Sequence, residues 1–181
     1  MGILSSIDTL FNLLVHGGAD DKPRYKNGSI GAASSYIDPV VPQMVEIGSN
    51  FISSPGSMVL AHDESPFMHC GMYKVKKTRI GNNVFLGPAA IITPGVIVGD
   101  GAIISAGSVV TGNVPRDTVV AGNPARVVCS VSEYIRDCKD SDCLYEVPEA
   151  FRSVFWGGRP REGDIKQFQK MVSDKAQHLP A

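Results

Sequence analysis

The sequence has no apolar run long enough to cross a membrane, few aromatic residues and almost no net charge. Aromatic residues make up 7% of the 181 residues, and the formal net charge is −1. A membrane-spanning helix needs about 20 consecutive apolar residues, and a nucleic-acid-binding protein carries a clustered basic surface. We therefore expect neither a membrane span nor a nucleic-acid partner.

The sequence also lacks a cysteine framework and the features of a signal peptide. Residues 3–15 are apolar, but they contain Asp8 and have no basic start or small-residue cleavage site. The four cysteines are Cys70, Cys129, Cys138 and Cys143. Their spacing favours reduced thiols, and hence the cytoplasm, over disulfides. Cys138 and Cys143 have no second pair at a zinc-binding spacing, so no metal is expected.

What the sequence does have is a period of six. The recurring aliphatic positions are Ile80, Leu86, Ile92, Val98, Ile104 and Val110. The small residues that follow them are Gly81, Gly87, Thr93, Gly99, Ser105 and Thr111. This period fits neither an α-helix, at about 3.6, nor a simple strand, at about 2. It is typical of a solenoid of parallel β coils, whereas the alternative is a β-sandwich with chance spacing.

Such a solenoid predicts where each residue points and where the chain departs from the repeat. We expect the aliphatic residue to point into the coil and the small residue to permit a tight turn. The predicted segments are an N-terminal helix and cap over 1–29, the repeat domain over 30–128 with a loop insertion at 63–77, and a C-terminal loop and helical tail over 129–181. An insertion between well-formed coils is a favoured place for function, because the scaffold positions it.

Residues 80–128, from IGNNVFLGPAAIITPGVIVGDGAIISAGSVVTGNVP to AGNPARVV, resemble the hexapeptide-repeat acyltransferases. The similarity is specific over residues 30–128 and weak elsewhere. It implies a mainly-β fold, a left-handed parallel β-helix. The helical spacing of apolar residues in 6–15 separately predicts a short N-terminal helix. The resemblance also implies acetyl-CoA as donor and a homotrimer with active sites between neighbouring subunits.

The same resemblance directs attention to His62, which stands at the start of the insertion. In the sugar and polysaccharide O-acetyltransferases, which this region is similar to, one histidine acts as general base on the acceptor hydroxyl. Imidazole suits that task near neutral pH. Asp63 is a second catalytic candidate, and either it or Glu64 is expected to orient the ring. Asp38 and His69 are expected to contact the acceptor.

The resemblance also implies a site for the coenzyme. Its pantetheine arm is expected to lie along the coils beside small residues that leave room for it. The expected cofactor-binding residues are Phe85, Gly87, Ser105, Ala106, Thr111, Arg116 and Arg126. The two arginines suit the coenzyme phosphates, because a guanidinium makes bidentate, charge-assisted contacts with such groups.

The resulting hypothesis is acetyl transfer to a hydroxyl of a sugar or polysaccharide precursor, and several alternatives remain. A γ-type carbonic anhydrase needs three imidazoles, but only His62 and His69 lie in this region. A non-enzymatic solenoid would serve as a scaffold. An N-acetyltransferase of an amino sugar or xenobiotic would keep the donor and change the acceptor; the antibiotic branch carries Asn before its histidine, where this chain has Ala61.

Overall fold

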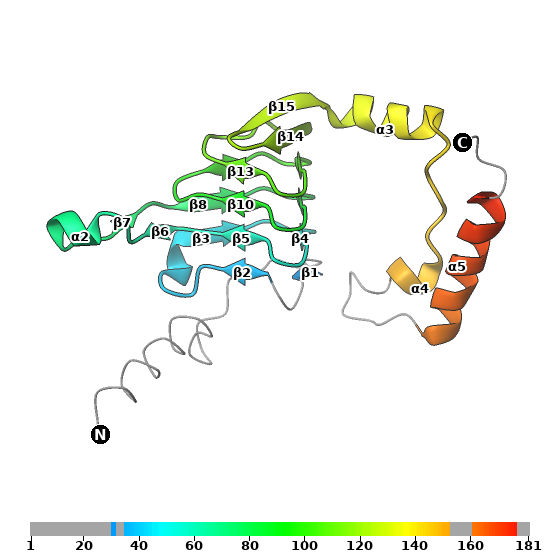
Figure 1. Cartoon of the computed structure of the whole chain (residues 1–181), viewed down its shortest axis with the longest axis horizontal. Coiled ribbons are helices and arrows are strands. Elements are labelled where there is room, and N and C mark those ends of the chain that lie inside the picture. The colour runs from blue at the N-terminus through cyan, green and yellow to red at the C-terminus, as the bar shows by residue number, and fades with distance from the viewer. Residues whose placement is uncertain (1–29, 32–34, 153–160, 177–181) are drawn as a thin grey trace, which may run out of the picture. The chain divides into compact units, whose positions relative to one another are not determined.

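The computed structural model describes residues 30–31, 35–152 and 161–176. The chain divides into two compact units, Met1–Ser132 and Glu133–Ala181. In the first unit, short strands follow one another around a stack of coils (Figure 1). The helix predicted within residues 1–29 lies outside the described residues.

Three parallel sheets form the walls of the stack. Sheet A contains β1 (Ile30–Gly31), β4 (Ile52–Ser53), β9 (Phe85–Leu86), β12 (Ile103–Ile104), β14 (Thr118–Gly122) and β15 (Ala125–Ser130). Sheet B contains β2 (Tyr36–Ile37), β5 (Met58–Val59), β10 (Ile91–Ile92) and β13 (Val109–Val110). Sheet C contains β3 (Val45–Ile47), β8 (Thr78–Ile80) and β11 (Ile97–Val98). All pairings in these sheets are parallel except that of β14 with β15, so the predicted left-handed parallel β-helix is confirmed.

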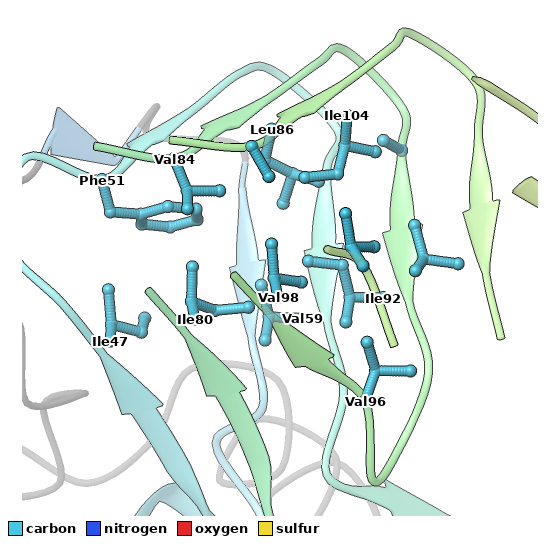
Figure 2. Packing of buried hydrophobic residues seen from close by; sticks show 14 of the residues in the cluster. Ile47, Phe51, Val59, Ile80, Val84, Leu86, Ile92, Val96, Val98 and Ile104 are labelled. Carbon is cyan, nitrogen blue, oxygen red and sulfur yellow. The ribbon is translucent and has the colours of Figure 1, made fainter. Parts of the chain in front are cut away.

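The register of these sheets explains the period of six. Phe85 pairs with Ile103 in sheet A and Ile91 pairs with Val109 in sheet B, so one coil uses three hexapeptides. The six aliphatic positions of the repeat are all 4% exposed or less, and several stack in the interior shown in Figure 2. The predicted inward direction of these residues is therefore confirmed.

The small residues serve a different purpose from the expected one. A Cβ on Gly81 would lie 2.7 Å from the backbone nitrogen of Asp100, and one on Gly99 would lie 2.5 Å from that of Arg116. These glycines permit close contact between successive coils. The residue with the left-handed backbone conformation at each turn comes two positions after the glycine: Asn83 (φ 55°) follows Gly81, and Gly101 (φ 71°) follows Gly99.

Both long interruptions of the repeat lie at the same corner, between sheets B and C. In the first coil the chain passes from β2 to β3 through a short 3-10 helix, Pro42–Met44. In the second coil it passes from β5 to β8 through a hairpin of β6 (His62–Asp63) and β7 (Lys74–Val75), with α2 (Phe67–Cys70) between them. Figure 1 shows this hairpin projecting from the coils. The corner therefore holds His62 beside non-repeating chain from two coils.

The second unit is helical. The helices after the coils are α3 (Val131–Asp140), α4 (Glu149–Arg152) and α5 (Glu162–Ala176). Lys175 of α5 lies 2.5 Å from Asp142 and places its ammonium 4.7 Å from the centre of the Tyr145 ring, which ties α5 to the segment after α3. Within the described residues, no helix is long and apolar enough to span a membrane. The domain boundary at 128/129 stays a prediction.

Candidate active site

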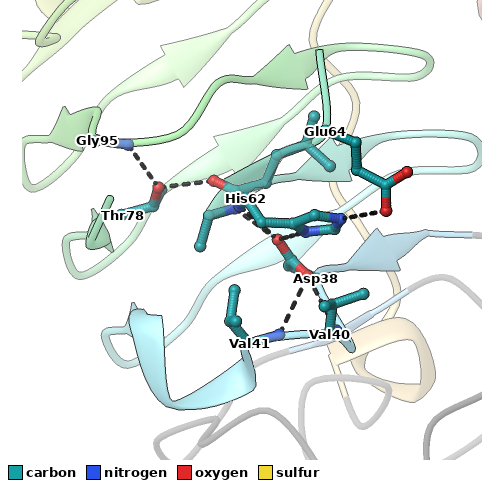
Figure 3. Close-up of polar contacts among 9 residues, drawn as sticks. Asp38, Val40, Val41, His62, Glu64, Thr78 and Gly95 are labelled. Atoms are coloured by element: carbon teal, nitrogen blue, oxygen red, sulfur yellow. Dashed lines mark hydrogen bonds and ion pairs between the residues drawn. The ribbon is translucent and has the colours of Figure 1, made fainter. Parts of the chain in front are cut away.

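His62 is paired with a buried carboxylate from the preceding coil. Its Nδ1 lies 2.6 Å from Oδ2 of Asp38, as Figure 3 shows. The two residues meet because β2 and β5 are neighbours in sheet B, where Ile37 pairs with Val59. Asp38 follows β2 and His62 comes three residues after Val59, so the ends of these strands bring the two side chains together.

Asp38 is fully buried and its carboxylate is fully used as an acceptor. Oδ2 also accepts hydrogen bonds from the backbone N–H groups of Ala61 and His62, each at 2.8 Å. Oδ1 accepts from those of Val40 at 3.0 Å and Val41 at 3.4 Å. Burial alone would raise the pKa of Asp38, but the hydrogen bonds from His62 and Ala61 outweigh it and lower that pKa. Asp38 is therefore ionised at neutral pH.

An ionised Asp38 fixes the tautomer of His62. A carboxylate only accepts hydrogen bonds, so Nδ1 must carry the proton in the 2.6 Å contact. In the neutral ring Nε2 is then unprotonated and able to accept a proton. This is the arrangement that a general base requires.

The Nε2 side of the ring faces the insertion. Oε1 of Glu64 lies 3.5 Å from Nε2, and the Tyr73 ring centre lies 6.2 Å from that of His62. The His62 side chain is 10% exposed, whereas that of Glu64 is 53% exposed. The solvated carboxylate of Glu64 thus lies beside Nε2 of a mostly enclosed imidazole.

Thr78 fixes the backbone at this corner. Its hydroxyl donates to the carbonyl of Leu60 at 2.6 Å and accepts from the N–H of Gly95 at 3.1 Å (Figure 3). Thr78 is fully buried, so these bonds are shielded from water. They connect the backbone just before His62 to that of the next coil.

A cavity of about 750 Å³ opens at this corner beside His62. Its walls come from sheet B, the hairpin and the corners of the next two coils. The lining residues are Tyr36, Met58, Leu60, His62, Asp63, Glu64, Lys74, Lys76, Thr93, Pro94 and Thr111. The volume falls in the range typical of small-molecule sites.

Asp63 does not orient His62. Successive residues on a strand point to opposite sides, and the Asp63 carboxylate lies 2.9 Å from the ammonium of Lys74 on β7. The hydrogen bond from Lys74, followed by those from Ser65, lowers the pKa of Asp63. The expectation that Asp63 orients the ring is thus wrong: Asp38 contacts Nδ1, and the carboxylate of Glu64, the other residue named for this role, lies 3.5 Å from Nε2. Asp63 still lines the cavity, and its catalytic role stays a prediction.

The other predicted acceptor residues fall in different places. Asp38, expected to touch the acceptor, is fully buried beneath His62. His69 lies exposed on α2 and is not among the residues that line the cavity. The structure therefore gives Asp38 the role of holding His62.

Of the predicted coenzyme residues, Thr111 is the one that lines the His62 cavity. Phe85, Gly87, Ser105 and Ala106 lie in sheet A or at the turn between sheets A and B. Arg116 is exposed and bonds to Asp117 at 3.1 Å, and Arg126 lies exposed on β15. Apart from Thr111, the predicted coenzyme residues therefore do not line the His62 cavity within one chain.

Sequence reasoning missed Tyr36 and two lysines of the insertion, Lys74 on β7 and Lys76 just after it. Tyr36 lines the cavity, and burial, followed by the charges of Asp38 and Glu64, raises the pKa of its phenol, which keeps it a hydrogen-bond donor. Lys74 and Lys76 line the same cavity. The alternation of these two lysines, just before the repeat resumes, was a readable sign that they share one face of a strand.

Residues 77–112 match the family model described as bacterial transferase hexapeptide (six repeats). The resemblance of this chain to the hexapeptide-repeat acyltransferases is thus confirmed, and the match covers the regular part of the coils. Protein CapG of Staphylococcus aureus is 39% identical over 97 residues, covering 51% of this chain and 56% of CapG. The chain therefore spans little more than half the length of this curated relative.

Solved structures with a similar fold include three acyltransferases. A maltose O-acetyltransferase from Clostridium difficile 630 gives a TM-score of 0.47 at 24% identity, covering 70% of this chain and 84% of that one. A galactoside acetyltransferase in complex with coenzyme A gives 0.48 at 22%, with coverages of 71% and 80%. AntD, an N-acyltransferase from Bacillus cereus, gives 0.49 at 22%, with coverages of 62% and 68%.

Metal-binding side chains do not gather in the described residues. No group of three or more His, Cys, Asp or Glu side chains there is arranged to hold a metal ion. The four cysteines are free thiols.

Proposed function

We propose that this protein transfers the acetyl group of acetyl-CoA to a hydroxyl of a sugar or polysaccharide precursor, with His62 as general base. The observation that supports this proposal is the pairing of His62 Nδ1 with buried Asp38 at 2.6 Å, which leaves Nε2 as the ring nitrogen available for proton transfer in a residue that lines the cavity. A hydroxyl is a weak nucleophile at neutral pH, so its attack on a thioester needs a base at this position.

In the proposed reaction His62 moves one proton. Nε2 accepts the acceptor hydroxyl proton as the oxygen forms its bond to the acetyl carbon, and ionised Asp38 stabilises the resulting imidazolium. The carbon–sulfur bond then breaks, and His62 returns the proton to the coenzyme thiolate. The donor supplies the activated acyl group, and the chain supplies the base and its orientation.

The coenzyme is proposed to lie against two copies of this chain. Thr111 shares the His62 cavity, whereas Phe85, Gly87, Ser105 and Ala106 lie elsewhere on the coils. A homotrimer would resolve this separation, because a neighbouring copy would set its own coils beside the His62 corner. Arg116 and Arg126 are the proposed contacts to the coenzyme phosphates.

The proposed donor and the four free thiols favour the cytoplasm as the site of the reaction. A role in polysaccharide biosynthesis follows from the proposed acceptor class.

The test is release of coenzyme thiol from acetyl-CoA in the presence of sugar acceptors, with wild type and His62→Ala compared. We expect His62→Ala to keep its oligomeric state in light scattering and to lose a factor of about 10²–10⁴ in transfer. Acetyl-CoA well above its Kd should raise the Tm of both proteins. Full activity of His62→Ala would refute the role of the base, and absence of acetyl-CoA binding would refute the function.

His69→Ala is the matched substitution of the second histidine. Because His69 is exposed on α2 and does not line the cavity, the structure predicts a much smaller loss than for His62. A loss of activity equal to that of His62→Ala would contradict the placement of His69 outside the active site.

A further inference from the structure

Two lysines of the insertion face the cavity that contains His62. Lys74 and Val75 form β7, and Lys76 follows directly after it; Val75 pairs with His62 across the hairpin. Alternate residues of a strand share one face, and both lysines line the cavity. This face of the hairpin therefore brings two positive charges to the site.

Among the described residues, some of the lysine and arginine side chains around the hairpin form ion pairs with carboxylates of this chain, and one does not. Lys74 lies 2.9 Å from Asp63. Lys77 and Arg79 both pair with Glu46, Arg79 at 2.9 Å. For Lys76, no carboxylate lies within ion-pair distance in the part of the chain that the structure describes. Its ammonium is thus the cation of this cavity wall that no protein carboxylate balances.

The stem of Lys76 is held in place even though the residue is exposed. Its backbone N–H donates to the carbonyl of Ala61 at 2.9 Å. Its aliphatic chain lies over Gly95 of the next coil, where an added Cβ would stand 2.8 Å from Lys76 Cδ and 3.1 Å from Lys76 Cβ. A stem held in this way loses less conformational freedom when its ammonium binds a ligand.

None of the carboxylates that line the same cavity lies within ion-pair distance of Lys76. Asp63 is already paired with Lys74, and Glu64 lies 3.5 Å from His62 Nε2. Asp38 is buried beneath the ring. An anionic group entering the cavity would therefore meet Lys76 as its available cationic partner.

We propose that Lys76 binds a carboxylate carried by the acceptor, so that the acceptor is an anionic sugar unit rather than a neutral one. This inference rests on the proposed acetyl transfer, and it adds the chemical class of the acceptor. The acceptor is favoured over the coenzyme phosphates as the source of the anion, because Lys76 shares the cavity of His62, where the reacting hydroxyl must lie.

The test compares matched charged and neutral acceptors. Methyl glucuronide and methyl glucoside form one pair, and methyl galacturonide and methyl galactoside form another. Coenzyme release is measured with wild type, Lys76→Met, Lys76→Arg and the control Lys77→Met, whose lysine pairs with Glu46 and does not line the cavity. Acetyl-CoA binding is measured separately for each protein.

We expect wild type to prefer the charged member of a pair in kcat/KM. Lys76→Met should reduce that preference about tenfold, as for a partly exposed charge-assisted contact. Lys76→Arg and Lys77→Met should retain it, and added salt should weaken it in wild type.

Three results would overturn the inference. The first is equal use of charged and neutral acceptors by wild type. The second is a Lys76→Met protein whose KM rises for acetyl-CoA while its acceptor preference stays unchanged, because the anion would then belong to the coenzyme. The third is wild type that binds acetyl-CoA but acetylates no uronide. Absence of acetyl-CoA binding would instead overturn the proposed function.

Discussion

Replacing Asp38 with asparagine tests the contact on which the proposed site depends. The substitution keeps the size of the side chain but replaces one oxygen by an NH2 group, which cannot accept a hydrogen bond. All five hydrogen-bond partners of Asp38 are donors: four backbone N–H groups and His62 Nδ1. An asparagine must therefore leave some of them without an acceptor.

The distances indicate which bonds are lost. Oδ2 has three partners at 2.6–2.8 Å, so the asparagine oxygen should take its position. The N–H groups of Val40 and Val41, at 3.0 and 3.4 Å from Oδ1, then face the NH2 group. Unsatisfied buried donors of this kind cost about 2 kcal/mol in the free energy of unfolding. For a chain of this size, the Tm should fall by about 4–8 °C.

The expected loss of activity is larger. A neutral amide still accepts the Nδ1 proton, but it does not balance the charge of the imidazolium that forms during proton transfer. We expect Asp38→Asn to lower kcat by a factor of about 10²–10⁴. The assay is coenzyme-thiol release at saturating acetyl-CoA, run well below the Tm of the variant.

Asp63→Asn is the matched comparison, because it removes the carboxylate of the residue next to His62 in sequence while leaving the 2.6 Å Asp38–His62 contact intact. It breaks the pair with Lys74 instead. We expect a smaller loss of kcat than for Asp38→Asn. An Asp38→Asn protein within threefold of wild type, or a larger loss in Asp63→Asn, would refute the assignment of Asp38 as the partner of His62.

Two further predictions concern stability. Ile104→Ala should lower the free energy of unfolding by about 3 kcal/mol, because this side chain is fully buried within the coils; Ile97→Ala, at a site 42% exposed, should cost much less, and equal losses in thermal unfolding would contradict the inward packing. The lowered pKa of Asp38 means that its contribution to stability is present above the unfolded pKa, about 3.9, and is lost as pH falls through the lower folded value. Wild type should therefore lose Tm below about pH 4 more steeply than Asp38→Asn, and parallel curves would argue against an ionised Asp38.

The period of six was enough to predict the coils and their core. Regular spacing determines which side chains face inward, so Ile80, Leu86 and Ile92 could be placed from sequence alone. The reason for the glycines could not, because Gly81 and Gly99 are required by contacts with the next coil rather than by their own φ angles. Contacts between coils depend on the register of the sheets.

The sequence by itself determined the solenoid through its repeat. It pointed to His62 through the family resemblance and the position of this residue at the start of the 63–77 insertion. Only the tertiary structure decided that Asp38 holds His62 and that Lys76 shares its cavity. Asp38 and His62 are separated by interruptions whose lengths follow no period, so their proximity arises from the pairing of β2 with β5. Lys76 reaches the cavity through the antiparallel pairing of β6 with β7, which lies outside the hexapeptide pattern.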